Sequence, residues 1–174
     1  LRDVYKRQDH DYIHSGIPLS DGEYVDGIFY GIMMRLGWEK YLVDSKFRPL
    51  CFEIPKKPVQ VFARELMDKF SISGIKIIGD LNTEVHRFMI AEHIIGPNDN
   101  PIISKIEEGN YDTVLAMEIT DFTVSEYIRD SGMLGKPRTV LAIGHFNLEE
   151  VGMEYMMEYL PVLFNESIPC HFVQ

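Results

Sequence analysis

Short apolar runs alternate with amphipathic stretches along the chain. Runs rich in β-branched residues predict buried strands at 49–54, 75–78, 85–95, 113–119, 140–143 and 168–173. Apolar residues three or four apart predict helices at 59–70, 101–109, 123–133 and 148–163, with another running from an Asp26 cap to Gly37. Pro55 and Pro58 predict a turn before the helix at 59–70. This alternation predicts an α/β fold with a mixed, largely parallel sheet flanked by helices.

The turn after the strand expected at 140–143 holds the most distinctive chemistry. Gly144 ends that strand, and Asn147 is a good N-cap for the helix that follows. Glu150, three residues after Asn147, completes a capping-box pattern, which leaves Glu149 free for other work. His145 is then expected at the carboxyl end of the strand, the rim where α/β sheets bind ligands.

His145 and Glu149 suit a divalent metal, because imidazole takes zinc or a transition metal and carboxylate accepts most hard cations. The alternative is an ordinary rim histidine beside glutamates that complement the helix dipole, since such pairs are common by chance. The spacing alone leaves both interpretations open.

A second pair of imidazoles lies near the start of the chain. His10 and His14 would share one face of either a helix or a strand. Residues 1–8 form the one markedly basic octet of an acidic chain and have the character of a non-native junction. We expect the α/β domain to cover 9–174 and to be the C-terminal part of a longer protein.

Composition narrows the possible functions. The 174 residues are 45% hydrophobic and carry a formal charge of −10, which disfavours nucleic-acid binding. The sequence contains no apolar run of about 20 residues, so no membrane span is expected and the cytoplasm is the default compartment. Cys51 and Cys170 are expected to be unbridged, poorly reactive thiols.

Several familiar catalytic motifs are absent. The sequence has no glycine-rich phosphate loop and no serine in a nucleophile-elbow context. His86 and His93 occupy a strand-like run and are interpreted as surface or core residues.

Several stretches together resemble the Nif-three-like family of dinuclear-metal-centre proteins, often labelled GTP cyclohydrolase I type 2. The closest resemblance is to a bacterial branch with the pattern His-Asp-His-x-His before Asp-Gly-Ile. The resemblance runs from about residue 9 to the C-terminus, and the Gly-His-x-x-x-Glu turn is its most specific part. The matching stretches are His-Asp-Tyr-Ile-His (10–14), Asp-Gly-Ile-Phe-Tyr-Gly (26–31), Leu-Gly-Trp (36–38) and Ala-Ile-Gly-His-Phe-Asn-Leu-Glu-Glu-Val-Gly-Met (142–153).

The resemblance implies two α/β lobes around a two-metal site, assembled as a toroidal homohexamer. It implies that His10, His14, His145 and Glu149 are metal ligands, with His14 where most of the family has aspartate. Glu118 falls near the family's Gly-Glu, which makes it a catalytic candidate that orients water or substrate. The family's N-terminal His-His-Pro or His-Glu-Pro ligand motif is not in this sequence, so part of the expected ligand set is missing.

The function expected from the resemblance is metal-dependent hydrolysis of a small polar substrate, nucleotide-like or phosphorylated. Two divalent cations, zinc, manganese or iron, would activate a bridging water. The alternative is a non-enzymatic, metal-binding regulatory protein that acts through its oligomeric surfaces. A plain structural α/β domain without metal is the third hypothesis.

Overall fold

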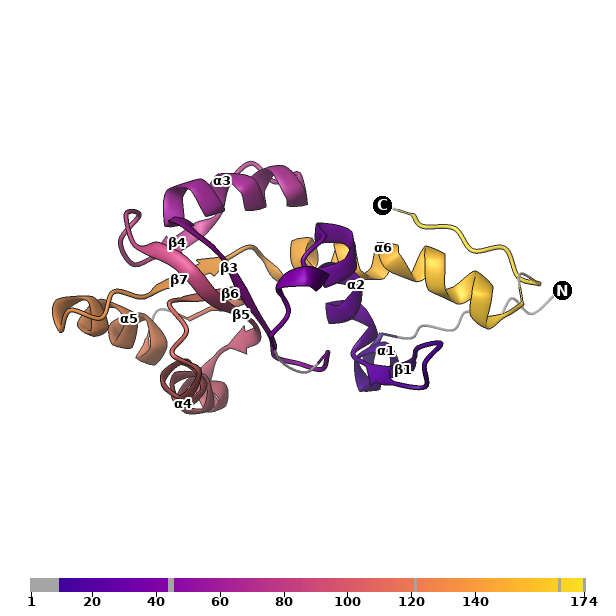
Figure 1. Ribbon diagram of the computed structural model, residues 1–174, viewed down its shortest axis with the longest axis horizontal. Coiled ribbons are helices and arrows are strands. Elements are labelled where there is room, and N and C mark those ends of the chain that lie inside the picture. Colours follow the sequence, from indigo (N-terminus) through magenta and orange to yellow (C-terminus); the bar gives the residue numbers. More distant parts are fainter. Residues whose placement is uncertain (1–9, 44–45, 121, 166, 174) are drawn as a thin grey trace, which may run out of the picture.

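The computed structural model describes residues 10–43, 46–120, 122–165 and 167–173. The junction-like octet 1–8 lies outside the described residues. Figure 1 shows an elongated molecule in which a sheet with its covering helices occupies one end. A smaller helical lobe occupies the other end, and the long helix α6 (His145–Leu163) runs from the sheet into it.

The helices agree closely with the hydrophobic pattern. Besides α6, the α-helices are α1 (Asp11–Ser15), α2 (Gly27–Leu36), α3 (Val59–Phe70), α4 (Asp99–Gly109) and α5 (Thr123–Met133). Two 3₁₀ helices are η1 (Glu39–Tyr41) and η2 (Gly96–Asn98). The strands are β1 (Ile17–Pro18), β2 (Tyr24–Val25), β3 (Leu50–Pro58), β4 (Lys76–Ile78), β5 (Glu84–Ile94), β6 (Thr113–Ile119) and β7 (Thr139–Ala142).

Strands β3 to β7 form a mixed sheet in the order β3-β5-β6-β7-β4. The central strands β5, β6 and β7 are parallel, whereas the outer strands β3 and β4 pair antiparallel with their neighbours. The α/β class and the mixed sheet are therefore as predicted, with the parallel pairings confined to the centre. Because β5, β6 and β7 point the same way, their carboxyl ends meet at one edge of the sheet.

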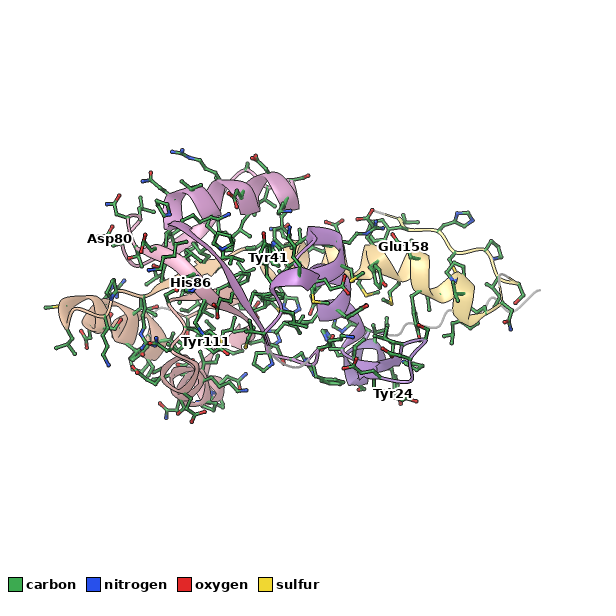
Figure 2. The ribbon with its side chains drawn as sticks, in the orientation of Figure 1. Tyr24, Tyr41, Asp80, His86, Tyr111 and Glu158 are labelled. Carbon is green, nitrogen blue, oxygen red and sulfur yellow. The ribbon has the colours of Figure 1, made fainter. Side chains whose placement is uncertain are left out.

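Both faces of the sheet are covered, and side chains fill the space between the layers (Figure 2). Alternate residues of β6 belong to different cores: Leu115 packs on the side of α2, α3 and α6, and Val114 packs on the side of α4 and α5. Five consecutive residues of β6, from Thr113 to Met117, are buried. A strand that is buried on both faces has a continuous apolar sequence, which explains why the sequence predicts a strand at 113–119.

Helices α2 and α6 pack at unusually close range. A Cβ added at Gly152 would overlap the carbonyl oxygen of Ile28, and one added at Gly31 would lie 2.7 Å from the carbonyl oxygen of Gly152. Only glycine fits at these two positions. The contact fixes the first half of α6, which carries His145 and Glu149, against α2.

Three local predictions are wrong. The chain does not turn at Pro55, because β3 continues to Pro58 through an irregular register beside β5. The described residues 167–173 form neither helix nor strand, so the strand expected at 168–173 is absent. The last helix begins at His145, and Asn147 is inside it instead of capping it.

The cysteines and the membrane expectation can also be compared with the structure. Cys51 and Cys170 are both thiols, which confirms that they are not bridged, but only Cys51 lies in a strand. None of the helices in the described part of the chain is long and apolar enough to cross a bilayer.

Candidate metal centre

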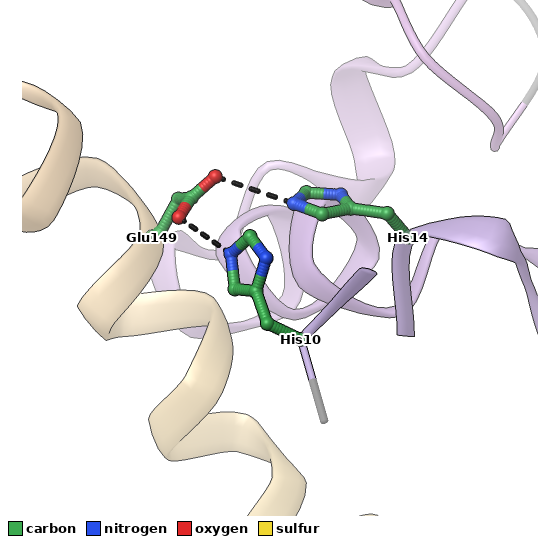
Figure 3. A group of neighbouring side chains, drawn as sticks. All are labelled: His10, His14 and Glu149. Atoms are coloured by element: carbon green, nitrogen blue, oxygen red, sulfur yellow. Dashed lines mark hydrogen bonds and ion pairs between the residues drawn. The ribbon is translucent and has the colours of Figure 1, made fainter. Parts of the chain in front are cut away.

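The short helix α1 presents two imidazoles on one face. His10 precedes the helix and His14 lies one turn later, with their ring centroids 4.8 Å apart. His10 Nε2 is 2.8 Å from Glu149 Oε2, and His14 Nε2 is 3.2 Å from Glu149 Oε1. Figure 3 shows both rings turned toward the carboxylate of Glu149.

The Asp26 carboxylate contacts the side of the His14 ring that faces away from Glu149. Its side chain caps α2 by accepting hydrogen bonds from the backbone N–H groups of Ile28 and Phe29. The same carboxylate lies 3.0 Å from His14 Nδ1, and Arg48 Nε lies 2.8 Å from it on another side. A carboxylate on Nδ1 fixes the tautomer and orientation of an imidazole, which leaves Nε2 available for a ligand.

Gly144 makes the turn that places His145 and Glu149. Its φ of 104° is in the region that disfavours side chains, and the helix starts immediately after it. His145 and Glu149 are one helical turn apart, with Nε2 of the histidine 3.1 Å from Oε2 of the glutamate. Asn147 instead donates a hydrogen bond to the backbone oxygen of Ile143. Glu149 thus lies beside both His14 and His145, although His145 belongs to a different group of potential ligands and the capping argument behind the prediction is wrong.

The electrostatics of this group are strongly coupled. Burial by itself would raise the pKa of Glu149, but hydrogen bonds from His14 and His10 and the charge of His145 lower it to about 2. Burial would lower the pKa of His14, yet its bonds to Asp26 and Glu149 raise it to about 9. A hydrogen bond to Asp11, joined by the contact with Glu149, raises the pKa of His10. Glu149 is therefore an anion around which positive charge collects.

A second group, which the sequence did not reveal, lies at the carboxyl ends of β5, β6 and β7. It consists of His93, Glu118 and His145. His93 Nδ1 contacts Glu118 Oε1, and His145 Nδ1 lies 3.3 Å from Glu118 Oε2. The sequence alone indicates a surface or core residue at His93, so the place of His93 in this group is a correction. The usable signal was its place opposite Glu118 in the parallel register of β5 and β6.

His86, the other histidine of β5, does not join either group. Its Nδ1 lies 2.6 Å from the backbone oxygen of Ile54, and Figure 2 shows it within the sheet lobe, away from α1, α2 and α6. The interpretation of His86 as a surface or core residue fits this position.

The residues present fit a divalent cation. In each group, one potential donor atom per residue lies within 4.8 Å of the others, and the donors are two imidazoles and one carboxylate. Zinc commonly takes three such ligands and leaves a fourth position open. The Asp26 carboxylate behind His14 is the support that histidine ligands usually have.

The protein has a mixed sheet covered by helices and a second, helical lobe. Two His/Glu groups lie around the first turn of α6. These features define a two-lobed α/β protein with a candidate metal centre. Its fold is that of the NIF3-related proteins. A Bacillus cereus protein related to NIF3 has a TM-score of 0.54 and 17% identity, over 75% of this chain and 38% of its own.

Two further solved structures are similar. Protein ybgI, of unknown function, has a TM-score of 0.56 and 18% identity, over 79% of this chain and 50% of its own. Staphylococcus aureus protein SA1388 has a TM-score of 0.53 and 16% identity, over 73% of this chain and 42% of its own. This chain thus spans half or less of the length of these three proteins. At such low identity the likeness establishes the fold, and the resemblance seen in the sequence is confirmed at that level.

No family model matches the chain, and no curated protein is similar to it by sequence.

Proposed function

We propose that this protein is a metal-dependent hydrolase of the Nif-three-like family that acts on a small polar, phosphorylated or nucleotide-like substrate. The observation that carries the proposal is the contact of three imidazoles, from His10, His14 and His145, with the Glu149 carboxylate. Three imidazoles from two distant parts of the chain thus lie around one carboxylate. Ionisable side chains with strongly shifted pKa values, such as His14 and Glu149, cluster at functional sites.

His10, His14 and Glu149 would hold the cation, with His145 beside them. A divalent cation there supplies a Lewis acid and lowers the pKa of water toward neutrality. Asp26 keeps Nε2 of His14 directed at the site, and the Glu149 carboxylate offers two oxygens.

A cavity of about 200 Å³ opens beside His93 of the second group and would give a place for the substrate. His93 and Glu92 line it, and Lys105 is its one lysine among the described lining residues. The volume is below the usual range for drug-sized ligands, so it suits a small molecule. A single ammonium group at its wall would pair with one anionic group, such as a phosphate ester.

Turnover of a panel of phosphoesters and nucleotides tests the proposal. The chain is stripped with EDTA and reloaded with zinc, manganese or iron(II). We expect hydrolysis that appears with metal, disappears with EDTA and falls at least about 100-fold in His14→Gln, since that variant removes one of three ligands. His86→Gln is the matched control, because this histidine lies outside both groups, and it should keep full activity.

The outcomes distinguish a metal-dependent hydrolase from a metal-binding protein without enzymatic activity. Metal bound at the site without turnover of any substrate would contradict the hydrolase and favour a metal-binding regulatory protein. Turnover that His14→Gln leaves unchanged would place the chemistry elsewhere in the molecule.

A further inference from the structure

We propose that a cavity at the amino-terminal edge of the sheet binds a small phosphate ester, at the opposite end of the central strands from the candidate metal centre. The cavity has a volume of about 340 Å³, at the lower end of the usual range for ligand pockets, which suits a small molecule. His86 and Tyr111, both labelled in Figure 2, are part of its lining. Its basic lining residues are Lys56, Arg87, Lys136 and Arg138.

The parallel register of β5, β6 and β7 builds this edge. Arg87, Asp112 and Arg138 occupy equivalent positions, each one residue before the first pairs of the parallel ladder. The two arginines therefore flank Asp112 on neighbouring strands. Figure 1 shows β7 leading into α6 and the helical lobe, so the amino ends of the strands face away from the metal centre. A strand of the length of β6 spans about 20 Å, which separates the two sites.

Positive charge is concentrated at this cavity although the chain is acidic. The whole sequence has a formal charge of −10, yet four Lys or Arg residues of the described lining face only two carboxylates, Glu84 and Asp112. Glu84 Oε2 lies 3.4 Å from Lys56 Nζ. Asp112 Oδ2 accepts hydrogen bonds from the backbone N–H groups of His86 and Arg87. Because both acids already have partners, the local field favours an anion.

Three hydrogen-bond donors in the lining are buried without a partner among the described residues. They are Thr83 Oγ1, Arg87 Nε and Arg138 Nη1. The side chain of Arg138 is only 4% exposed, and its Nη2 lies 3.1 Å from Glu107 Oε2. Arg87 Nη1 pairs in the same way with Glu53, so each guanidinium keeps a buried donor unused. Buried donors without an acceptor are costly and call for an explanation.

A phosphate ester matches this set of donors better than a carboxylate does. Its phosphoryl group brings three strong acceptor oxygens and close to two negative charges, whereas a carboxylate brings two oxygens and one charge. Guanidinium groups such as those of Arg87 and Arg138 pair with phosphate through parallel hydrogen bonds. Lys56 and Lys136 are exposed, so their ammonium groups can move to meet the ligand.

Asp112 is compatible with an anion at this place. Its Oδ1 is also buried without a hydrogen-bond partner among the described residues. Burial raises the pKa of the Asp112 carboxyl, and a nearby anion would raise it further. A carboxyl that takes up a proton becomes a donor, and Asp112 would then contribute a hydrogen bond to the phosphate.

Phosphate binding to the metal-stripped chain tests the proposal. EDTA in the buffer excludes any phosphate that a cation at α6 would hold, and the measurement needs no turnover. Calorimetric titration with glycerol 3-phosphate should show saturable binding at a single site. Amide NMR shifts should place that site at residues 83–87, 110–112 and 136–138. Inorganic phosphate is the second probe: binding of the free ion without binding of the ester would overturn the ester.

Charge-removing variants locate the site by affinity. Lys136→Gln should lower the affinity for glycerol 3-phosphate about 3-fold or more, and Arg138→Gln more than about 10-fold, because the second removes a buried, charged donor. Lys136 is exposed, so its variant tests the site even where Arg138→Gln does not fold. Lys105→Gln is the matched control, since Lys105 lines the cavity beside His93, and it should bind the ester as wild type does.

Two results would overturn the proposal. The first is the lack of saturable binding up to about 10 mM ester, which would leave the buried donors to ordered water. The second is binding that Lys105→Gln weakens and Lys136→Gln leaves unchanged, which would place the phosphate in the cavity of the proposed hydrolase. Weakening in Lys136→Gln with unchanged affinity in Lys105→Gln supports the site at the amino-terminal edge.

Discussion

The two His/Glu groups share His145 but are built differently. The first lies between helices, with the side chains of His14 and Glu149 9% and 11% exposed and that of His10 45% exposed, and Asp26 backs His14. The second lies at strand ends, with the Glu118 side chain 38% exposed. Burial strengthens interactions with charge and a supporting carboxylate fixes the ligand, so the first group should bind its cation more tightly and release it more slowly.

The difference suggests a division of labour. The first group would hold the cation of the proposed hydrolase, whereas the more exposed second group lies beside the cavity where a substrate could enter. The cavity beside His93 lies on the open side, which agrees with that assignment.

Replacing Glu149 should have the largest effect. In Glu149→Gln the carboxylate that contacts His10, His14 and His145 becomes a neutral amide. Since loss of a supporting group already lowers metal affinity ~10–100-fold, loss of this ligand should lower the metal affinity of the first group by more than about 100-fold. Calorimetric titration with zinc measures it. Retention of two tightly bound cations in Glu149→Gln would show that the buried group is not a metal site.

Asp26→Asn should weaken metal binding by the first group alone, by about 10–100-fold. Asparagine still caps α2 through its side-chain oxygen, so the helix should survive. Its amide group would then face His14 Nδ1, which favours the tautomer with a proton on Nε2, the atom needed by the metal. Zinc titration should show lower affinity for one cation and unchanged affinity for the other. Equal weakening of both would mean that the two groups do not act separately.

The pH dependence of the metal-free protein should separate the buried group from the open one. The pKa of His14 is raised from 6.5 to about 9, so its contribution to stability is complete below pH 6.5 and is lost as the pH rises through 9. The pKa of Glu149 is lowered from 4.5 to about 2, so its contribution is present above pH 4.5 and is lost as the pH falls through 2. The joint contribution is therefore greatest between pH 4.5 and 6.5.

Thermal unfolding in EDTA measures this contribution. Wild type should be more stable than His14→Gln at pH 5.5, by on the order of 1–3 kcal/mol, and the difference should shrink at pH 9.5. The variant His93→Gln provides the comparison at the open group. A difference between wild type and His14→Gln that is the same at both pH values would contradict the coupling of His14 to Glu149.

Much of this architecture was predictable because it depends on local rules. The hydrophobic pattern predicted the observed bounds of α3, β6 and α5. The capping residues Asp26 and Gly37 predicted the two ends of α2. The failures arose where tertiary contacts override local preference. Pro55 lies in a strand, since the irregular register of β3 against β5 accommodates it.

The candidate site was only half predictable. His10, His14, His145 and Glu149 came from spacing and from a family resemblance. His93 was missed because a lone histidine in an apolar run carries no local signal. Its partners lie 25 and 52 residues later in sequence, and only the parallel register of β5, β6 and β7 brings the three together.

Glu150→Gln should have the smallest effect and is the natural control for Glu149→Gln. The sequence suggested that Glu150 folds back onto an Asn147 cap, which would make its loss cost ~0.5–2 kcal/mol. In the structure α6 begins at His145, so Glu150 lies within the helix, where its Oε1 is buried without a hydrogen-bond partner among the described residues.

No capping contact is therefore lost in Glu150→Gln, and we expect a stability change within about 0.5 kcal/mol and unchanged zinc stoichiometry. Thermal unfolding and metal counting on both variants make the comparison. A stability loss near 2 kcal/mol for Glu150→Gln would restore the capping interpretation. Loss of a cation from Glu150→Gln, with both kept in Glu149→Gln, would exchange the roles of the two glutamates and move the centre to the other side of α6.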